Sequence, residues 1–337
     1  MRSTVQDIAR EAGVSTATVD RVLNERGGVR SRTREVVLET AQRLGYIAEG
    51  APPRAAPPIR LAFVLPRGTN AFMAMLGRQI ELQAAARPEV AVAIEAIEGF
   101  DPDTLSATLR DLRGRVQGVG VVALDHPKVR EAIRLLSESG IPVVTIASDI
   151  PRVPREAYVG IDNRQAGRLA GYVLGRFLGG GGPRKVAMLA GSLSYRGHEE
   201  REMGFRHVLA EDFPALEIVA LREMRDDRDR AYAEASTLLD RHPDLAGIYN
   251  IGAGNQGIAR VLVERDRAKS VVFVAHDATD ANRALLLNGT LDAIIDQNPR
   301  VEAREALNIL TDAIRGTRSE PHPPRLQIIF RENLPET

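Results

Sequence analysis

One stretch of the sequence has the residue spacing of a cofactor-binding loop. Gly252, Gly254 and Gly257 form the pattern G-x-G-x-x-G after an expected strand, and Asp277 follows twenty residues after the last of them. In dinucleotide-binding proteins such glycines let the backbone approach a pyrophosphate, and an acidic residue binds the ribose. The pattern lies late in the chain rather than in a first strand–helix unit. We therefore keep an NAD(P)-binding oxidoreductase as an alternative, beside a tight strand-to-helix turn that lines a pocket.

Other catalytic patterns do not occur in the sequence. It contains no G-x-S-x-G, G-x-x-x-x-G-K-[ST] or H-E-x-x-H motif, and it has no cysteine. Thiolate nucleophiles, disulfides and cysteine-ligated zinc are thereby excluded. The six histidines are scattered, so we expect no metal site. The sequence predicts a protein that is not an enzyme and that needs no cofactor.

Arginines are concentrated near the N-terminus. Residues 1–60 contain ten arginines, no lysine and seven acidic residues, whereas the remainder carries a matching negative excess. A small basic segment on a mildly acidic body indicates a nucleic-acid contact confined to that segment. The formal net charge of the 337-residue chain is zero, which excludes a uniformly basic nucleic-acid coat.

Three short helices are expected in residues 1–47, which we interpret as a DNA-binding domain. Thr4 can cap the first helix, Gly13 would end it, and Ser15 would cap the second. A third helix is predicted over 31–44, followed by Gly45. The apolar positions of the three helices recur at helical spacing and predict a common core. Two short helices joined by a glycine turn form the helix-turn-helix pattern.

A proline-rich segment follows these helices. Residues 48–58 read AEGAPPRAAPP and contain four prolines. Proline lacks a backbone donor and fixes φ, so a regular helix is disfavoured and an extended chain is expected. We predict that this segment is a linker.

From residue 59 onward, short apolar runs alternate with amphipathic helical patterns, which is typical of βαβ units with parallel strands. Helices are expected at 72–87, 103–115, 129–139, 164–177, 200–210 and 228–242. The predicted strands are 59–65, 90–97, 118–123, 142–147, 157–160, 185–190, 217–221, 246–250, 271–275 and 292–296.

Ten strands are many for a single sheet, so we predict two α/β lobes with a cleft between them. The N-lobe would comprise residues 59–162 and 296–319, and the C-lobe 163–295 and 320–333. The fold class predicted for the whole chain is an all-α head plus a two-lobed α/β body, with parallel sheets covered by helices on both faces. No run of eighteen apolar residues occurs, so no transmembrane helix is expected.

The first 46 residues resemble the DNA-binding segment of the LacI-type family of bacterial transcription regulators. The resemblance rests on TVQDIAREAGVSTATVDRVLN at 4–24 and VRSRTREVVLETAQRLGY at 29–46. In a helix-turn-helix the first turns of the second helix enter the major groove. The resemblance implies base contacts by Thr16 and Ala17, and Arg21 has the reach to contact a guanine. Phosphate contacts are expected from Thr4, Ser15, Thr18, Asn24, Thr33 and Arg34.

Two features depart from the family pattern. Asp20 stands where the family usually has serine, and a carboxylate is repelled by phosphates. Family members also follow the third helix with a hinge helix that inserts a leucine into the minor groove. Residues 48–58 contain no leucine. We therefore predict no hinge helix and no apolar wedge, and an operator that is less bent at its centre.

Residues 59–333 resemble the periplasmic sugar-binding fold that the same family uses as its effector domain. The matching segments are TNAFMAML at 69–76, VGIDNRQAGRLAGYVLGRF at 159–177, REMGF at 201–205, HDATDANRALLLNG at 276–289 and IIDQNPR at 294–300. In that fold, polar side chains at strand ends bind sugar hydroxyls, and an aromatic ring covers the C–H face. The resemblance implies an effector site made of Asn70, Phe72, Asp125, Arg201, Asn250, Asp277 and Gln297. Asp162 and Asn163 are expected to cap the next helix or to organise the crossover between lobes.

These observations predict a cytoplasmic, homodimeric transcription regulator, interpreted as a repressor. Its partners would be double-stranded operator DNA and a sugar or polyol bound between the lobes, with no membrane partner. The N-terminus has no apolar signal sequence, which favours the cytoplasm. A stand-alone sugar-binding module with a vestigial head is the second alternative, beside the oxidoreductase.

Overall fold

A computed structural model describes residues 3–24, 26–47 and 57–335. Contacts between residues divide the chain into two compact units, 1–57 and 58–337, which we call the head and the body. Each unit is described by itself. Most of the predicted linker, 48–56, lies outside the described residues.

The head contains the three predicted helices, α1 (Val5–Ala12), α2 (Thr16–Leu23) and α3 (Ser31–Arg43). Thr4 caps α1 in a reciprocal capping box with Asp7, and Gly13 ends α1 with a left-handed φ of 67°. Ser15 caps α2 by accepting a hydrogen bond from the Thr18 amide. The three helices pack on a small core of Ile8, Ala9, Val19, Val22, Val37 and Ala41.

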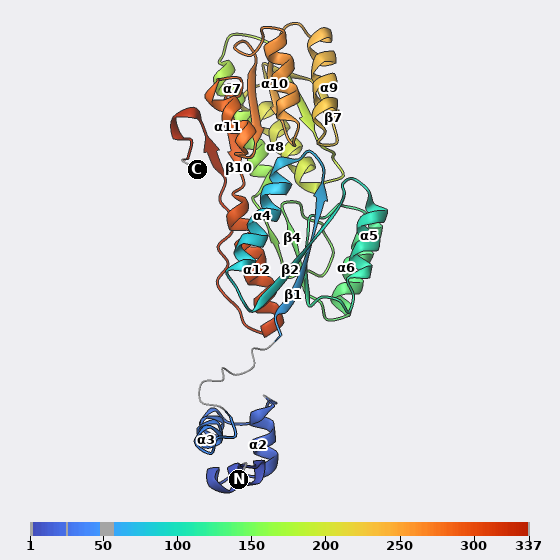
Figure 1. Cartoon of the computed structure of the whole chain (residues 1–337). Helices are drawn as coiled ribbons and strands as arrows, with labels where there is room; N and C mark the ends of the chain where they lie inside the picture. The colour runs from blue at the N-terminus through green and yellow to red at the C-terminus, as the bar shows by residue number, and fades with distance from the viewer. Residues whose placement is uncertain (1–2, 25, 48–56, 336–337) are drawn as a thin grey trace. The chain divides into compact units, whose positions relative to one another are not determined.

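The first lobe of the body is built on a five-stranded, fully parallel sheet with the strand order β2-β1-β3-β4-β5. Figure 1 shows α4 and α12 on one side of this sheet and α5 and α6 on the other. Its strands are β1 (Ile59–Arg67), β2 (Val90–Glu98), β3 (Gly118–Val121), β4 (Val143–Ile146) and β5 (Ala157–Val159). The helices are α4 (Ala71–Ala85), α5 (Pro102–Asp111), α6 (Pro127–Glu138) and α12 (Pro299–Arg315).

The second lobe is built on a six-stranded sheet with the order β11-β10-β9-β8-β6-β7. One apolar cluster joins α7 and α8 to the sheet, and another joins α9, α10 and α11 to it. Its strands are β6 (Arg184–Ala190), β7 (Leu216–Glu223), β8 (Leu245–Asn250), β9 (Val272–His276), β10 (Ala293–Asp296) and β11 (Gln327–Ile329). The helices are α7 (Asn163–Leu178), α8 (Arg196–Asp212), α9 (Arg228–Arg241), α10 (Asn255–Glu264), α11 (Asp280–Leu287) and the 3₁₀ turn η1 (Arg331–Asn333).

The structure confirms the predicted fold class and the ten predicted strands, with one addition. The short strand β11 pairs antiparallel with β10 at the edge of the second sheet, so this sheet is not entirely parallel. No strand was predicted from the sequence at Gln327–Ile329. The chain passes between the lobes after β5, after β10 and again after α12.

Candidate functional site

Helix α2 separates a buried face from an exposed one. Val19 and Val22 are buried in the core of the head, whereas Thr16, Ala17 and Arg21 are exposed. The three predicted base-contacting residues therefore share a surface that a DNA groove can reach.

Asp20 on the same helix has local partners of its own. Its Oδ1 accepts a hydrogen bond of 2.8 Å from the Asn24 side chain, and its Oδ2 lies 3.4 Å from a guanidinium nitrogen of Arg26. The second donor of the Asn24 amide is bonded to the Asp20 carbonyl at 3.0 Å. The Asn24 amide thus stabilises the end of α2 in this structure, and both of its donors would have to be released for the predicted phosphate contact. Arg26 partly compensates the negative charge of Asp20, which the resemblance to the family places near the DNA phosphates.

The other predicted phosphate contacts lie near the first turns of the three helices. Thr4 and Ser15 are exposed caps, and Thr18 shares a 2.9 Å hydrogen bond with the Ser15 hydroxyl. Thr33 and Arg34 are half-buried in the first turn of α3. Backbone amides and positive partial charge at such helix starts favour anions.

The body contains a pocket where the carboxyl ends of strands from both sheets face each other. Its lining combines polar, charged and aromatic side chains from both lobes, as is typical of small-molecule sites. The first lobe contributes residues that follow β1, β2 and β4, and the second lobe contributes the start of α8 and the ends of β7, β8, β9 and β10. Open α/β sheets bind ligands at this edge because the loops after the strands converge there.

Five of the seven predicted effector residues line this pocket, namely Asn70, Phe72, Arg201, Asp277 and Gln297. Asn70 is the N-cap of α4, so its Oδ1 accepts from the amides of Phe72 and Met73. Its Nδ2 donates to Asp226 Oδ2 across the lobes at 2.9 Å. The strand-to-helix turn after β1 thereby fixes the position of both predicted residues.

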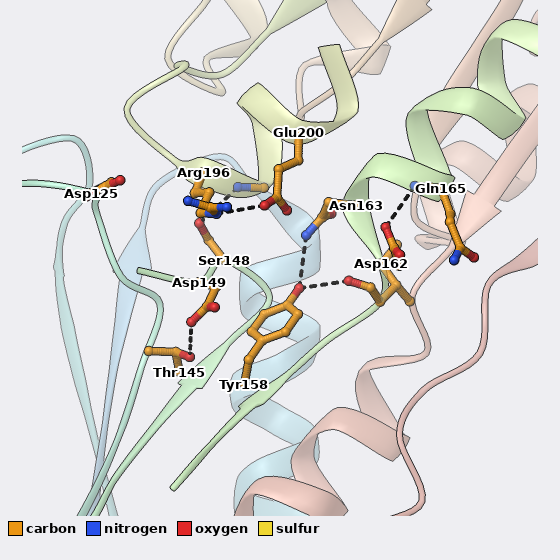
Figure 2. A network of polar contacts seen from close by, with 12 residues as sticks. Asp125, Thr145, Ser148, Asp149, Tyr158, Asp162, Asn163, Gln165, Arg196 and Glu200 are labelled. Atoms are coloured by element: carbon orange, nitrogen blue, oxygen red, sulfur yellow. Dashed lines mark hydrogen bonds and ion pairs between the residues drawn. The ribbon is translucent and has the colours of Figure 1, made fainter. Parts of the chain in front are cut away.

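Arg201 is almost completely buried on α8 and is held by neutral partners. Its Nε donates to Asn163 Oδ1 at 2.7 Å, and its Nη1 donates to the carbonyl oxygen of Ile251 at 2.9 Å. Asn163 in turn donates to the Tyr158 hydroxyl at 2.9 Å. Asp162 caps α7 by accepting from the Gln165 amide, as Figure 2 shows together with the Tyr158–Asn163 contact. Asn163 thus positions Arg201, while Asp162 caps α7.

Asp277 and Gln297 lie side by side after β9 and β10. The Gln297 amide donates to Asp277 Oδ1 at 2.7 Å, while Gln297 Oε1 is buried and has no hydrogen-bond partner within the part of the chain that the structure describes. Burial raises the pKa of the Asp277 carboxyl to about 7, against the opposing effects of Arg201 and the Gln297 amide. The pair therefore offers a ligand both a free acceptor and a carboxyl group that titrates near neutrality.

The structure does not place Asp125 and Asn250 in the pocket lining. The Asp125 carboxylate is paired with Arg130 on the following helix. The Asn250 amide is fully buried, where it donates to the Ala253 carbonyl at 2.8 Å and to Asn255 Oδ1 at 2.6 Å. In this structure Arg130 therefore pairs with Asp125, and the Asn250 amide holds the turn that follows β8, so neither side chain faces the pocket.

Sequence reasoning missed several lining residues, among them Phe100, Tyr195, Arg225 and Asp226. Asp226 links three segments, because it accepts from Asn70 Nδ2 and from the Ala253 amide, and its carbonyl accepts from the Thr69 hydroxyl at 2.6 Å. The sequence contains Asp226, Asp227 and Asp229 close together after β7. The position of these aspartates after a strand indicates that they lie near the cleft. It does not indicate which of the three carboxylates faces the cleft.

The G-x-G-x-x-G pattern has structural roles in this pocket. Gly254 begins α10 with a left-handed φ of 90°. A Cβ on Gly257 would lie far inside van der Waals contact with the Arg228 carbonyl oxygen and 2.8 Å from the Tyr232 amide nitrogen on α9. The Ala253 amide, which a pyrophosphate would need, donates instead to the Asp226 carboxylate at 2.9 Å. These contacts explain the glycines as a tight turn and a close helix–helix approach.

Among residues 3–24, 26–47 and 57–335, no group of three or more histidine, aspartate or glutamate side chains is arranged to hold a metal ion. Within the same residues, every helix is too short or too polar to span a lipid bilayer.

Comparisons with known proteins match both parts of the chain. Residues 4–49 match the family described as bacterial regulatory proteins, lacI family, and residues 61–318 match the periplasmic binding protein domain. Catabolite control protein A of Priestia megaterium is 30% identical over 282 residues, covering 82% of this chain and 75% of that protein. The HTH-type transcriptional regulator DegA of Bacillus subtilis is 26% identical over 275 residues, covering 80% and 78%.

A solved structure supports the description of the body. GanP, a glucose-galactose binding protein from Geobacillus stearothermophilus, superposes with a TM-score of 0.76 at 25% identity, covering 83% of this chain and 100% of that chain. A helix-turn-helix head on a body of the periplasmic-binding-protein type defines a DNA-binding transcription regulator that responds to a small molecule. The chain belongs to the lacI family of bacterial regulatory proteins, with a periplasmic binding protein domain as its body.

Proposed function

We propose that this protein is a transcriptional repressor whose affinity for operator DNA is set by a sugar or polyol bound between the lobes of the body. The observation that carries the proposal is the joint presence of an exposed recognition surface on α2 and a polar pocket at facing strand ends. GanP, to which the body is similar, is described as a glucose-galactose binding protein. The protein would act in the cytoplasm without catalysing a reaction.

The pocket supports this proposal because its polar groups suit a polyhydroxylated ligand. Asn70 belongs to the first lobe, while Arg201 on α8, Asp277 after β9 and Gln297 after β10 belong to the second lobe. The Oε1 atom of Gln297 accepts no hydrogen bond from the described residues. Phe72 adds an apolar ring at the same surface. A ligand that contacts both lobes favours one lobe arrangement, and only such a difference in affinity between arrangements can change DNA binding.

The operator follows from the proposed dimer. Two heads on a symmetric dimer would bind a pseudo-palindromic site whose half-sites are separated by about 34 Å, one turn of the double helix. The sequence of 48–58 contains no leucine that could enter the minor groove. We therefore propose an operator that is bent less at its centre than an apolar wedge would require.

The head is tested by replacing Arg21 with alanine in the full-length protein. We expect operator binding to weaken by about 1–3 kcal/mol, with relaxed preference at one base pair, because Arg21 would lose a bidentate contact to guanine. Binding is measured by fluorescence anisotropy against a selected operator and against single-base variants of it.

Arg43→Ala is the matched control, because Arg43 is an exposed arginine at the end of α3 paired with Glu11. It should leave the base preference unchanged. A uniform loss of affinity for all sequences in Arg21→Ala would make Arg21 a phosphate contact. Retention on DNA that does not depend on sequence or salt would contradict the proposed function.

A further inference from the structure

We propose that the effector of this pocket carries an anionic group, a carboxylate or a phosphate, on a polyhydroxylated body. This inference rests on the proposed function and narrows its ligand class from sugars and polyols to sugar acids and sugar phosphates. It starts from three guanidinium groups, those of Arg67, Arg201 and Arg225, which all line the pocket.

None of the ion pairs found among the described residues involves these three arginines, although eighteen such pairs occur elsewhere in the head and body. Unpaired guanidinium groups around a cavity attract an anion that enters it.

The carboxylates that face the pocket do not balance these charges. Asp226 accepts hydrogen bonds from Asn70 and from the Ala253 amide, so both of its oxygens have partners. Asp277 is bonded to Gln297, and burial raises its pKa to about 7, which leaves it partly protonated at neutral pH. Three guanidinium groups thus line the pocket against two carboxyl groups, one of which is partly protonated, so its positive charge exceeds its negative charge.

Arg201 provides the buried part of this charge. Only 4% of its surface is exposed, and its Nε and Nη1 are bonded to a side-chain amide oxygen and a backbone carbonyl. Its Nη2 has no hydrogen bond within the described residues. A buried cation with neutral partners is costly, and an anion or a strongly polar ligand group would relieve that cost.

Arg225 and Arg67 provide charge at the opening, because both are exposed. The Arg225 guanidinium lies 5.6 Å from the centre of the Phe100 ring, and that ring packs edge-on against Tyr195 at 5.3 Å. Stacking on an aromatic face orients a guanidinium and leaves its N–H donors free for an oxyanion. Burial lowers the pKa of the neighbouring His198, so this imidazole adds no positive charge at neutral pH.

The backbone holds Arg225 in this place. Arg225 and Asp226 have left-handed φ values of 53° and 55°, and the Arg225 amide donates to the Gly191 carbonyl at 2.7 Å. Consecutive left-handed residues other than glycine are uncommon and are kept where the surrounding structure fixes them. The pocket therefore combines polar groups for hydroxyls with a positioned cation at its opening for the anionic group.

The test measures ligand binding to the full-length protein by calorimetry and thermal shift with matched pairs. The pairs are D-glucose with D-gluconate, D-glucose with D-glucose 6-phosphate, and D-ribose with D-ribose 5-phosphate. We expect an anionic member to bind at least about tenfold more tightly than its neutral partner, and the advantage to shrink between about 50 mM and about 500 mM NaCl. Comparing gluconate with the phosphates identifies which anionic group the pocket takes.

Arg225→Gln should remove most of the preference for the anion, because the affinity of the anionic member should fall much more than that of its neutral partner. Arg222→Gln is the matched control, because Arg222 lies on β7 outside the pocket lining, with Glu234 at 3.7 Å. An equal loss for neutral and anionic ligands in Arg225→Gln would show a merely structural role and contradict the inference.

Two other outcomes separate this inference from the proposed function. Neutral sugars that bind as tightly as their anionic partners, and that change operator affinity, would overturn the inference and retain the function. An anionic ligand that binds tightly but leaves operator affinity unchanged would retain the inference and overturn the function. A panel in which neither class binds would count against the anionic effector.

Discussion

Two carboxyl groups near the pocket, those of Asp277 and Glu302, form no ion pair within the described residues. Both oxygens of Glu302 on α12 are buried without a hydrogen-bond partner, and burial raises its pKa well above the usual value. Burial also raises the pKa of Asp277 to about 7. Both groups are therefore most compatible with the folded state when they are protonated.

The charged groups around these two carboxyls act in both directions. Arg201 lowers the pKa of each carboxyl, whereas Asp296 raises both. Asp226 further raises the pKa of Asp277, and Asp277 raises that of Glu302. Because burial is the largest cause for both groups, the folded state keeps these protons at pH values where the unfolded chain releases them.

We predict that the free energy of unfolding falls as pH rises from about 4 to about 7. In this window the unfolded chain binds fewer protons than the folded chain, and each such group contributes a slope of up to about 1.4 kcal/mol per pH unit. Glu302→Gln should reduce the slope and stabilise the protein most at the upper end of the window. Urea denaturation at several pH values checks this, and an unchanged slope in Glu302→Gln would contradict it.

Asp226 connects the two lobes through single hydrogen bonds. Asp226→Ala should lower the free energy of unfolding by about 1–3 kcal/mol, because the amides of Asn70 and Ala253 lose an acceptor. Asp226→Asn is the matched control, since asparagine tolerates the left-handed φ of 55° and keeps one acceptor oxygen. Equal unfolding energies for Asp226→Ala and the wild type would show that these bonds add no stability.

At the scale of elements, α9 and α10 approach each other through Gly257. Gly257→Ala should destabilise the body by about 1–3 kcal/mol or more, because the new methyl group would overlap backbone atoms of α9. Gly180→Ala is the control, because nothing lies within 4 Å of a Cβ there. Thermal unfolding of both variants measures the difference. A Gly257→Ala protein as stable as Gly180→Ala would contradict the packing role of this glycine.

The strands could be predicted because each forms a buried apolar run bounded by helical patterns, as in 118–123 and 142–147. Strand β11 could not, because its three residues follow the proline-rich stretch 320–324 and contain only two apolar side chains in succession. Its antiparallel pairing with β10 depends on a long return of the chain from α12, which leaves no local pattern.

Residues of the pocket lining could be predicted where a position shortly after a strand was enough to bring the side chain to the pocket. Asp277 and Gln297 directly follow β9 and β10, and Asn70 lies three residues after the end of β1, so the ends of these strands bring all three residues to the pocket. Asp125 and Asn250 also follow strands, but Arg130 and Asn255 hold their side chains. Arg67 and Arg225 were missed because the absence of an ion-pair partner is a property of tertiary packing and has no sequence pattern.

At the scale of the whole molecule, the protein joins a DNA-binding head to a ligand-responsive body. The chain crosses between the lobes of the body three times, and α12 returns from the second sheet to pack on α4, β3 and β4 of the first. A ligand that stabilises one lobe arrangement can therefore act on the first lobe, from which residue 59 leads back toward the head. The sequence between head and body is rich in proline, so we expect coupling without a hinge helix.

The most direct test of this account is the operator affinity of the full-length protein with and without a saturating ligand. The ligand is the one that most stabilises the protein in the thermal-shift panel, and affinity is measured by anisotropy at constant salt. The account predicts a change of roughly 5- to 150-fold, the usual range for coupled sites. An operator affinity that stays the same while the ligand is demonstrably bound would contradict the claim that the body controls the head.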